Sequence, residues 1–264
     1  MSEKLPPSSS SSPSAVATLS PLNRVLSPPL NLLPPNTPPH LFPSAVSYFN
    51  SLPWCAALIN DHSPSAGRLP GHGQAIAFIP QCFNPVSARH DQFVGRTLSH
   101  GHPDAGSHSS GSSEGEGEGR TRGPPIRHLL SLFRPADDTE LRDPSRPILR
   151  VATLFALGDG TSGYEGIVHG GLTATILDES LGVVNELNTA LGKEGSLFSA
   201  SSVTASLSVK FLAPVATAEK AICVTSWVEG MQGRKTIMKA EVTNGKGEKL
   251  AVAESVWVAV KPRL

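Results

Sequence analysis

The chain has 264 residues, and its 22 lysines and arginines are balanced by 22 aspartates and glutamates. A net charge of zero and a pI near 7.1 provide no long-range field toward polyanions, so we expect no nucleic-acid partner. No apolar run approaches the ~20 residues that a membrane-spanning helix needs. The three cysteines are odd in number and widely spaced, which indicates reduced thiols and favours a cytoplasmic protein.

Proline and serine dominate residues 1–45, and this composition predicts a disordered tail. The segment holds a single acidic residue, which is also typical of an organellar transit peptide, so a mitochondrial location stays open. Six prolines between positions 28 and 39 would break the amphipathic helix of such a peptide. The tail is therefore the favoured interpretation.

Residues 46–98 are richer in aromatic and aliphatic side chains, and we predict an N-terminal extension with short helices interrupted at Pro53. Residues 99–125 consist largely of glycine, serine and glutamate, which predicts a flexible linker. His100 and His102 form a His-x-His pair inside this linker. Because no ordered element supplies further ligands beside them, we expect no metal site.

Periodic order begins with residues 126–264, which we predict to form one domain. The apolar run 148–157 predicts a strand. A long helix follows from near Gly170, because apolar residues recur there at spacings of three and four. The pattern then alternates with a period of two from Val203 to Phe211, and three further apolar segments predict more strands. One long helix wrapped by an antiparallel sheet of five to six strands is an α+β fold.

The segment most informative about chemistry runs from His169 through Gly170 and Gly171 to Asp178. The first turn of a helix has N–H groups without intrahelical partners, and two glycines let a ligand approach them. Together with the helix dipole, these groups suit a developing oxyanion. Asp178 lies eight residues farther along, roughly 12 Å by helix rise. A carboxylate facing this oxyanion site must therefore come from a second copy of the domain.

The pattern His-Gly-Gly-x(6)-Asp resembles the motif of the hotdog-fold thioesterase superfamily, in particular its PaaI-like acyl-CoA thioesterase group. The resemblance covers roughly residues 146–264, and the preceding extension is similar to that of fungal hotdog proteins. It implies a homodimer or tetramer with active sites at the dimer interface. It also implies hydrolysis of an acyl-CoA or acyl-carrier thioester in lipid or secondary metabolism, with no cofactor.

The same resemblance assigns roles to individual residues. Asp178 would be the general base or the nucleophile, and the Gly170 N–H would be the oxyanion donor. His169 would position the start of the helix, and Gly171 would border the substrate. Thr204 corresponds to the hydroxyl that family members place near the attacking water.

Basic residues are the expected contacts for the CoA nucleotide. Arg234 and Lys235 match a Gly-Arg-Lys tract of related members, and Lys210 is a weaker candidate, since a strand lysine is ordinarily only solvated. One departure concerns Gly163, because PaaI-like enzymes carry Asn or Gln six residues before the motif histidine. A hotdog dimer that binds acyl-CoA or a partner without hydrolysis therefore stays open as an alternative, whereas hotdog dehydratases and hydratases use a different motif.

Overall fold

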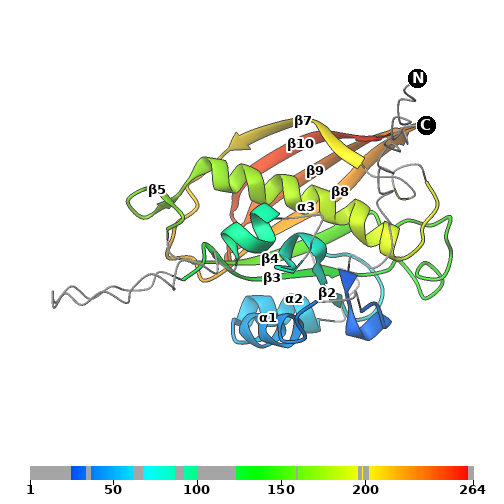
Figure 1. Cartoon of the computed structure of the whole chain (residues 1–264), viewed down its shortest axis with the longest axis horizontal. Helices are drawn as coiled ribbons and strands as arrows, with labels where there is room; N and C mark the ends of the chain where they lie inside the picture. Colours follow the sequence, from blue (N-terminus) through cyan, green and yellow to red (C-terminus); the bar gives the residue numbers. More distant parts are fainter. Residues whose placement is uncertain are drawn as a thin grey trace, which may run out of the picture.

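An antiparallel sheet with helices on both faces organises the chain (Figure 1). This computed structural model describes residues 25–33, 37–61, 68–86, 92–99, 123–158, 160–195, 198 and 202–260. The sheet has eight strands in the order β1-β2-β3-β4-β8-β9-β10-β7, and neighbouring strands are antiparallel. Their bounds are β1 (Val25–Leu26), β2 (Ile76–Pro80), β3 (Ile126–Phe133), β4 (Arg150–Leu157), β7 (Ser202–Phe211), β8 (Ile222–Gln232), β9 (Lys235–Thr243) and β10 (Lys249–Ala259).

The long helix α3 (Gly170–Ala190) lies across one face of this sheet. The apolar residues that predicted it are buried against the strands, which is where the helix gains its stability: Ile176, Leu177, Leu181, Val184 and Leu187. Six of the eight strands come from residues 126–264. The predicted α+β hotdog fold, one long helix against an antiparallel sheet, is confirmed.

Part of the opposite face of the sheet, at β2 and β3, is covered by the layer of α1 (Leu41–Asn50) and α2 (Pro53–Asn60). Tyr48 of α1 stacks on His128 of β3, with 4.6 Å between ring centroids, and its hydroxyl donates to the Lys220 carbonyl over 2.8 Å. Pro53 is the first residue of α2, a position where its missing N–H costs nothing. With helices on both sides, β3 and β4 are buried on both faces.

The ordered chain begins earlier than composition indicated. β1 lies inside the region predicted as a tail, yet Val25 is buried and pairs with Pro80 of β2. Three short helical turns, η1 (Pro28–Leu30), η2 (Gln81–Phe83) and η3 (Gln92–Leu98), complete this part. Residues 1–24 of the predicted tail and 100–122 of the predicted linker lie outside the described residues.

Strand β7 departs from the strict alternation that its sequence predicts. Its pairing with β10 shifts between Val256 and Trp257, so that Ser206 and Thr204 are paired while Ala205 is extra. Such a bulge moves the residues beyond it to the other face of the sheet. Thr204 therefore faces α3, and Val203 is 52% exposed.

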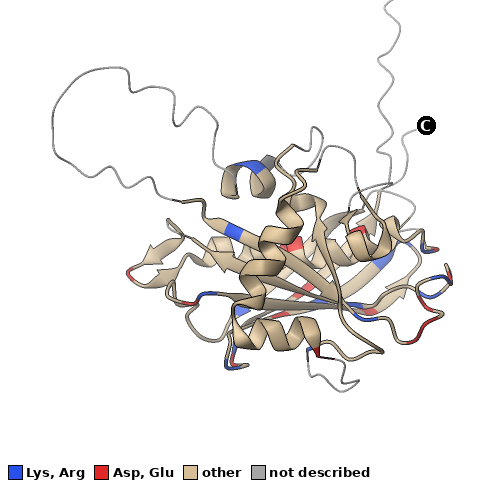
Figure 2. Ribbon diagram, turned by 90° about the horizontal axis from the view of Figure 1, so that it is seen from below, with Lys and Arg blue, Asp and Glu red and all other residues tan. Residues whose placement is uncertain are grey.

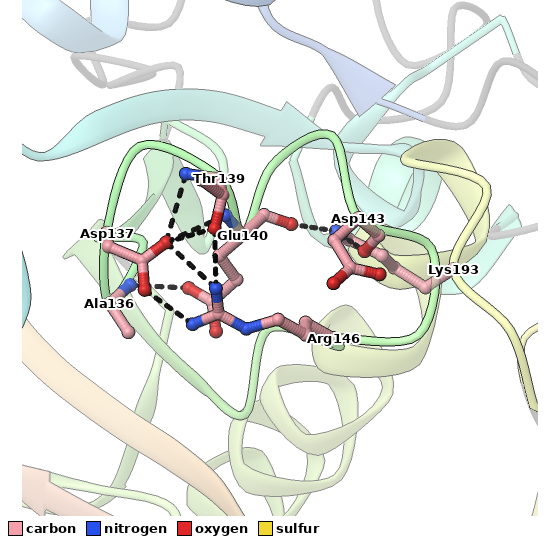
Figure 3. Close-up of polar contacts among 7 residues, drawn as sticks. All are labelled: Ala136, Asp137, Thr139, Glu140, Asp143, Arg146 and Lys193. Atoms are coloured by element: carbon pink, nitrogen blue, oxygen red, sulfur yellow. Dashed lines mark hydrogen bonds and ion pairs between the residues drawn. The ribbon is translucent and has the colours of Figure 1, made fainter.

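The loop between β3 and β4 is fastened to the C-terminal end of α3 (Figure 3). The Lys193 ammonium donates to the carbonyl oxygens of Glu140, Leu141 and Asp143. Within the loop, the Arg146 guanidinium binds both carboxylate oxygens of Asp137, at 2.9 and 2.7 Å. These contacts fix where α3 ends, and the sheet fixes its middle.

Basic and acidic residues are interspersed along the ribbon rather than gathered by sign (Figure 2). No helix of the described residues is long and apolar enough to cross a membrane. A small separate hairpin, β5 (Ser162–Tyr164) and β6 (Ile167–Val168), precedes α3 and projects from the body of the sheet (Figure 1).

Candidate functional site

The N-terminus of α3 opens into a cleft of about 570 Å³, which we call the α3 cleft. The β5–β6 hairpin forms one wall, and the chain around the end of β7 forms the other. The side chains on these two walls are largely apolar, and they include Tyr164, Ile167, Phe211, Leu212 and Val215. The backbone and side chains of His169, Gly170 and Thr173 supply the polar groups at its base.

His169 caps α3 with its side chain. Its Nδ1 accepts a hydrogen bond from the Gly171 N–H over 2.9 Å, and its carbonyl accepts from the Thr173 N–H over 3.1 Å. Because Nδ1 is an acceptor, the neutral ring carries its proton on Nε2. This geometry favours a positioning role for His169 over a role as a base.

The two motif glycines differ in what they do. A Cβ on Gly171 would lie 2.9 Å from Nδ1 of His169, so the glycine is needed for the cap, and Gly171 does not line the cleft. A Cβ on Gly170 would meet only Phe211, at an ordinary 3.5 Å. Gly170 is exposed in the cleft, and its N–H belongs to the first helical turn. The structure thus places an available donor where the motif predicts an oxyanion site.

Asp178 lies half-buried in the middle of α3, away from the cleft. Its Oδ1 accepts a hydrogen bond from Thr204 Oγ1 of β7 over 2.8 Å. The structure therefore brings these two predicted residues together, although they are 26 positions apart. It does not bring them to Gly170 of the same subunit, because eight residues of helix separate the two by roughly 12 Å.

The predicted CoA-binding residues lie at two different ends of the sheet, one near the Asp178–Thr204 pair and one near Gly170. Arg234 and Lys235 are exposed at the turn into β9, and Lys235 pairs with Val258, which in turn pairs with Val203. They therefore lie at the Thr204 end of the sheet. Lys210 lies at the opposite end of β7, about 23 Å along the strand from Val203. Since successive residues of a strand point to opposite faces, its side chain points away from the face of Phe211, and it does not line the cleft.

Gly163 stands where PaaI-like enzymes carry Asn or Gln, and the structure shows a steric cause for the difference. A Cβ there would lie 3.0 Å from both Cα and Cδ2 of His169, so the histidine ring fills the space that an Asn or Gln would need. The following residue, Tyr164, is 81% exposed and lines the α3 cleft. Tyr164 and Phe211 line the cleft but were not among the predicted site residues.

Other reactive groups lie away from the site. Cys55, Cys82 and Cys223 are buried, and burial raises the pKa of Cys223 to about 11. Such thiols are poor nucleophiles. No group of three or more metal-ligating side chains occurs among the described residues, and His100 and His102 lie outside them.

Comparisons with known proteins point to one family. Residues 165–251 match the sequence profile of the thioesterase superfamily. Verlamelin biosynthesis protein B of Lecanicillium sp is 28% identical over 165 residues, which cover 52% of this chain and 68% of that protein.

Two solved structures are similar to part of this chain. A crystal structure of a thioesterase superfamily protein is 29% identical, covers 41% of this chain and has a TM-score of 0.35. The match spans 51% of that protein, about half its length. A hypothetical thioesterase of Streptococcus pneumoniae, crystallised with coenzyme A, is 19% identical over 45% of this chain and 86% of that one, with a TM-score of 0.37.

Proposed function

We propose that the chain, whose residues 165–251 match the thioesterase-superfamily model, hydrolyses an acyl-CoA or acyl-carrier thioester to a free acid and a thiol. The observation that carries this proposal is the hydrogen bond between Asp178 and Thr204. It holds a carboxylate in a fixed orientation beside the edge strand β7. The α3 cleft, with the Gly170 N–H, lies at the other end of the same strand.

The edge of the sheet supports a homodimer. Among the described residues, β7 is the last strand in the sheet order, and β10 is its neighbour on one side only. A free edge of ten residues attracts another strand unless it is covered. Val203, Phe211 and Leu212 are large apolar residues exposed along it. We therefore infer that β7 pairs antiparallel with β7 of a second copy about a two-fold axis, as dimers commonly do.

This pairing would complete the site. In an antiparallel pair, the Phe211 end of one β7 lies beside the Val203 end of the other. The α3 cleft of one subunit then approaches the Asp178–Thr204 pair of its partner. Arg234 and Lys235 lie at the same level of the sheet as that pair, which suits a role in binding the CoA phosphates near the partner's cleft.

The proposed chemistry uses only side chains and backbone of the protein. Thr204 donates to Oδ1 of Asp178, which leaves Oδ2 free to accept a proton from water. The water oxygen forms a bond to the thioester carbon, and the carbonyl oxygen gains a negative charge. The N–H of Gly170 of the partner subunit, with its helix dipole, stabilises that charge. The tetrahedral intermediate then breaks the C–S bond, and the leaving thiolate takes the proton from Asp178.

A chain-length panel of acyl-CoAs with a thiol-detecting reagent tests this proposal. We expect the wild-type protein to release CoA and Asp178→Ala to lower kcat by about 10²- to 10⁴-fold, the range of a general base. Glu179→Ala is the matched control, because the adjacent carboxylate is rotated about 100° around the helix. It is expected to keep wild-type turnover.

A second candidate is a dimer that binds acyl-CoA or a partner without hydrolysing it. The observation that favours it is Gly163, where the PaaI-like polar residue is absent and the His169 ring leaves no room for one. If no acyl-CoA is cleaved faster by the wild-type protein than by Asp178→Ala, hydrolysis is excluded for the panel and the binding function is favoured. We propose a cytoplasmic location for either function, with mitochondria as the alternative.

A further inference from the structure

Three buried polar side chains lie beyond Asp178, and we call them the buried polar cluster: Asn185, Thr236 and Trp257. They are 4%, 1% and 9% exposed, respectively. Asn185 Oδ1, Thr236 Oγ1 and Trp257 Nε1 have no hydrogen-bond partner in the part of the chain that the structure describes. Buried polar atoms in folded proteins are paired in the large majority of cases. Three buried polar atoms without partners in one region therefore require an explanation.

Strand register places Trp257 beside the residues of the proposed reaction. On β10 it pairs with Thr204 of β7 on one side and with Thr236 of β9 on the other. Residues paired across antiparallel strands have their Cβ atoms about 5 Å apart. Trp257 is therefore the direct neighbour of the threonine that holds Asp178.

The residues of α3 that meet the cluster also lie near Asp178. The Trp257 ring packs on Gly182, where a Cβ would lie 3.0 Å from Cη2. Gly182 is one helical turn beyond Asp178, and Asn185 follows three residues later, so all three share one side of α3. Asn185 Nδ2 donates to Ser202 Oγ of β7 over 3.2 Å, which fixes its amide and leaves Oδ1 unsatisfied. The cluster thus occupies the α3–sheet interface next to Asp178.

The chemistry of the three atoms restricts what they bind. An indole N–H only donates, an amide oxygen only accepts, and a threonine hydroxyl does both. A carboxylate would be repelled by Asn185 Oδ1, and a carbonyl oxygen would leave that acceptor unpaired. A hydroxyl group donates and accepts, so it satisfies both kinds of partner at once.

We propose that Asn185, Thr236 and Trp257 bind a hydroxyl group on the acyl chain, which makes hydroxyacyl thioesters the preferred substrate class. The inference rests on the proposed hydrolysis at Asp178, since it places the acyl chain along α3 beyond that residue. Gly182 and Asn185 lie about 6 and about 10 Å past Asp178 along the helix axis. The recognised hydroxyl is therefore in the middle of the acyl chain of the substrate, not on the carbons next to the thioester.

Matched substrates test the proposal. Acyl-CoAs of one chain length, unsubstituted or hydroxylated at successive carbons, are compared by kcat/KM. We expect at least one mid-chain hydroxyacyl-CoA to be preferred by about tenfold or more, because a site built for a hydroxyl discriminates against the analogue that lacks it. Trp257→Phe removes the donor and Thr236→Val removes the hydroxyl, and each is expected to reduce the preference ratio. Trp227→Phe, a tryptophan on the opposite face of the sheet, is the control and keeps the ratio.

The outcomes separate this inference from the proposed function. Hydrolysis of the unsubstituted chain as fast as every hydroxylated one overturns the hydroxyl site while hydrolysis itself stands. If nothing is hydrolysed, equilibrium binding to Asp178→Asn decides: tighter binding of a mid-chain hydroxyacyl-CoA supports the site, and equal binding of both substrates overturns it. Thr236→Val nearly preserves shape, so the test does not depend on the folding of Trp257→Phe.

Discussion

The Thr204 hydroxyl restrains one oxygen of the Asp178 carboxylate through a bond of 2.8 Å. Thr204→Val keeps the shape of the side chain and removes this donor, so the carboxylate is free to rotate. We expect kcat to fall about 10- to 100-fold, because a misplaced base costs rate even when the substrate still binds. Steady-state kinetics check this, and KM is expected to change little.

Two variants make that result specific to the hydrogen bond. Thr204→Ser keeps the donor and is expected to retain most of the turnover. Ser206→Ala changes an exposed hydroxyl on the same strand and is expected to have no effect. Wild-type kcat in Thr204→Val would show that the bond has no part in the reaction.

At the residue scale, sequence patterns predict residues that lie within one element better than contacts between elements. The motif from His169 to Asp178 is readable because the helical period fixes both the cap and the carboxylate. The approach of Gly163 to the His169 ring is a contact between a hairpin and a helix end, and no local pattern encodes it. The same holds for Phe211, which reaches the cleft only because β7 ends there.

At the scale of elements, the predictable parts are those with a strong apolar period. α3 is predicted by its buried residues at spacings of three and four, whereas the bulge in β7 is not predicted, because one extra residue leaves the composition of a strand unchanged. β1 and β2 were missed for another reason. They pair across some fifty residues of sequence, Val25 with Pro80, and β1 has only two residues.

The α1 layer docks on β3 partly through the stack of Tyr48 on His128, and this contact depends on pH. Burial, and then the nearby Arg127, lower the pKa of His128 below its usual value of 6.5. The unfolded chain therefore takes up a proton at a pH where the folded His128 remains neutral. Stability from this group is fully present above the unfolded pKa, and it is lost as the pH falls below 6.5 toward the lowered folded value.

We expect the melting temperature to drop between about pH 7.5 and about pH 5.5, and to drop less in His128→Gln, which cannot take up the proton. Thermal unfolding followed by circular dichroism at both pH values checks this. His40→Gln, at an exposed histidine before α1, serves as the control and should behave like the wild type. An equal drop in His128→Gln and in the wild type would assign the pH effect to other groups.

At the scale of the whole molecule, the two faces of the sheet have separate tasks. α1 and α2 cover the part of one face formed by β2 and β3, whereas the face covered by α3 ends, among the described residues, at the edge strand β7. The proposed site is divided between the two ends of that edge. A strictly monomeric protein in size-exclusion chromatography with light scattering would contradict the shared site.

Gly170→Pro is suited to test whether two subunits share one site. Proline lacks the N–H that would hold the oxyanion, yet it is favoured at the first position of a helix. His169 already has φ −58° and ψ 130°, a conformation that a following proline permits. We therefore expect Gly170→Pro to fold and dimerise, and to lose about 10²- to 10³-fold in kcat, as other enzymes do on losing one oxyanion donor.

Mixing two inactive variants then gives a decisive readout. Gly170→Pro and Asp178→Ala are combined in equal amounts under conditions that allow subunits to exchange. Random pairing makes half of the dimers mixed, and each mixed dimer holds one site with both an intact Gly170 and an intact Asp178, so about a quarter of wild-type activity should return. Recovery needs exchange, so the same mixture assayed before exchange is the control and stays inactive. If exchange is demonstrated by mass and activity does not return, Gly170 and Asp178 do not act together across the interface, and the α3 cleft has to be paired with a carboxylate of its own subunit.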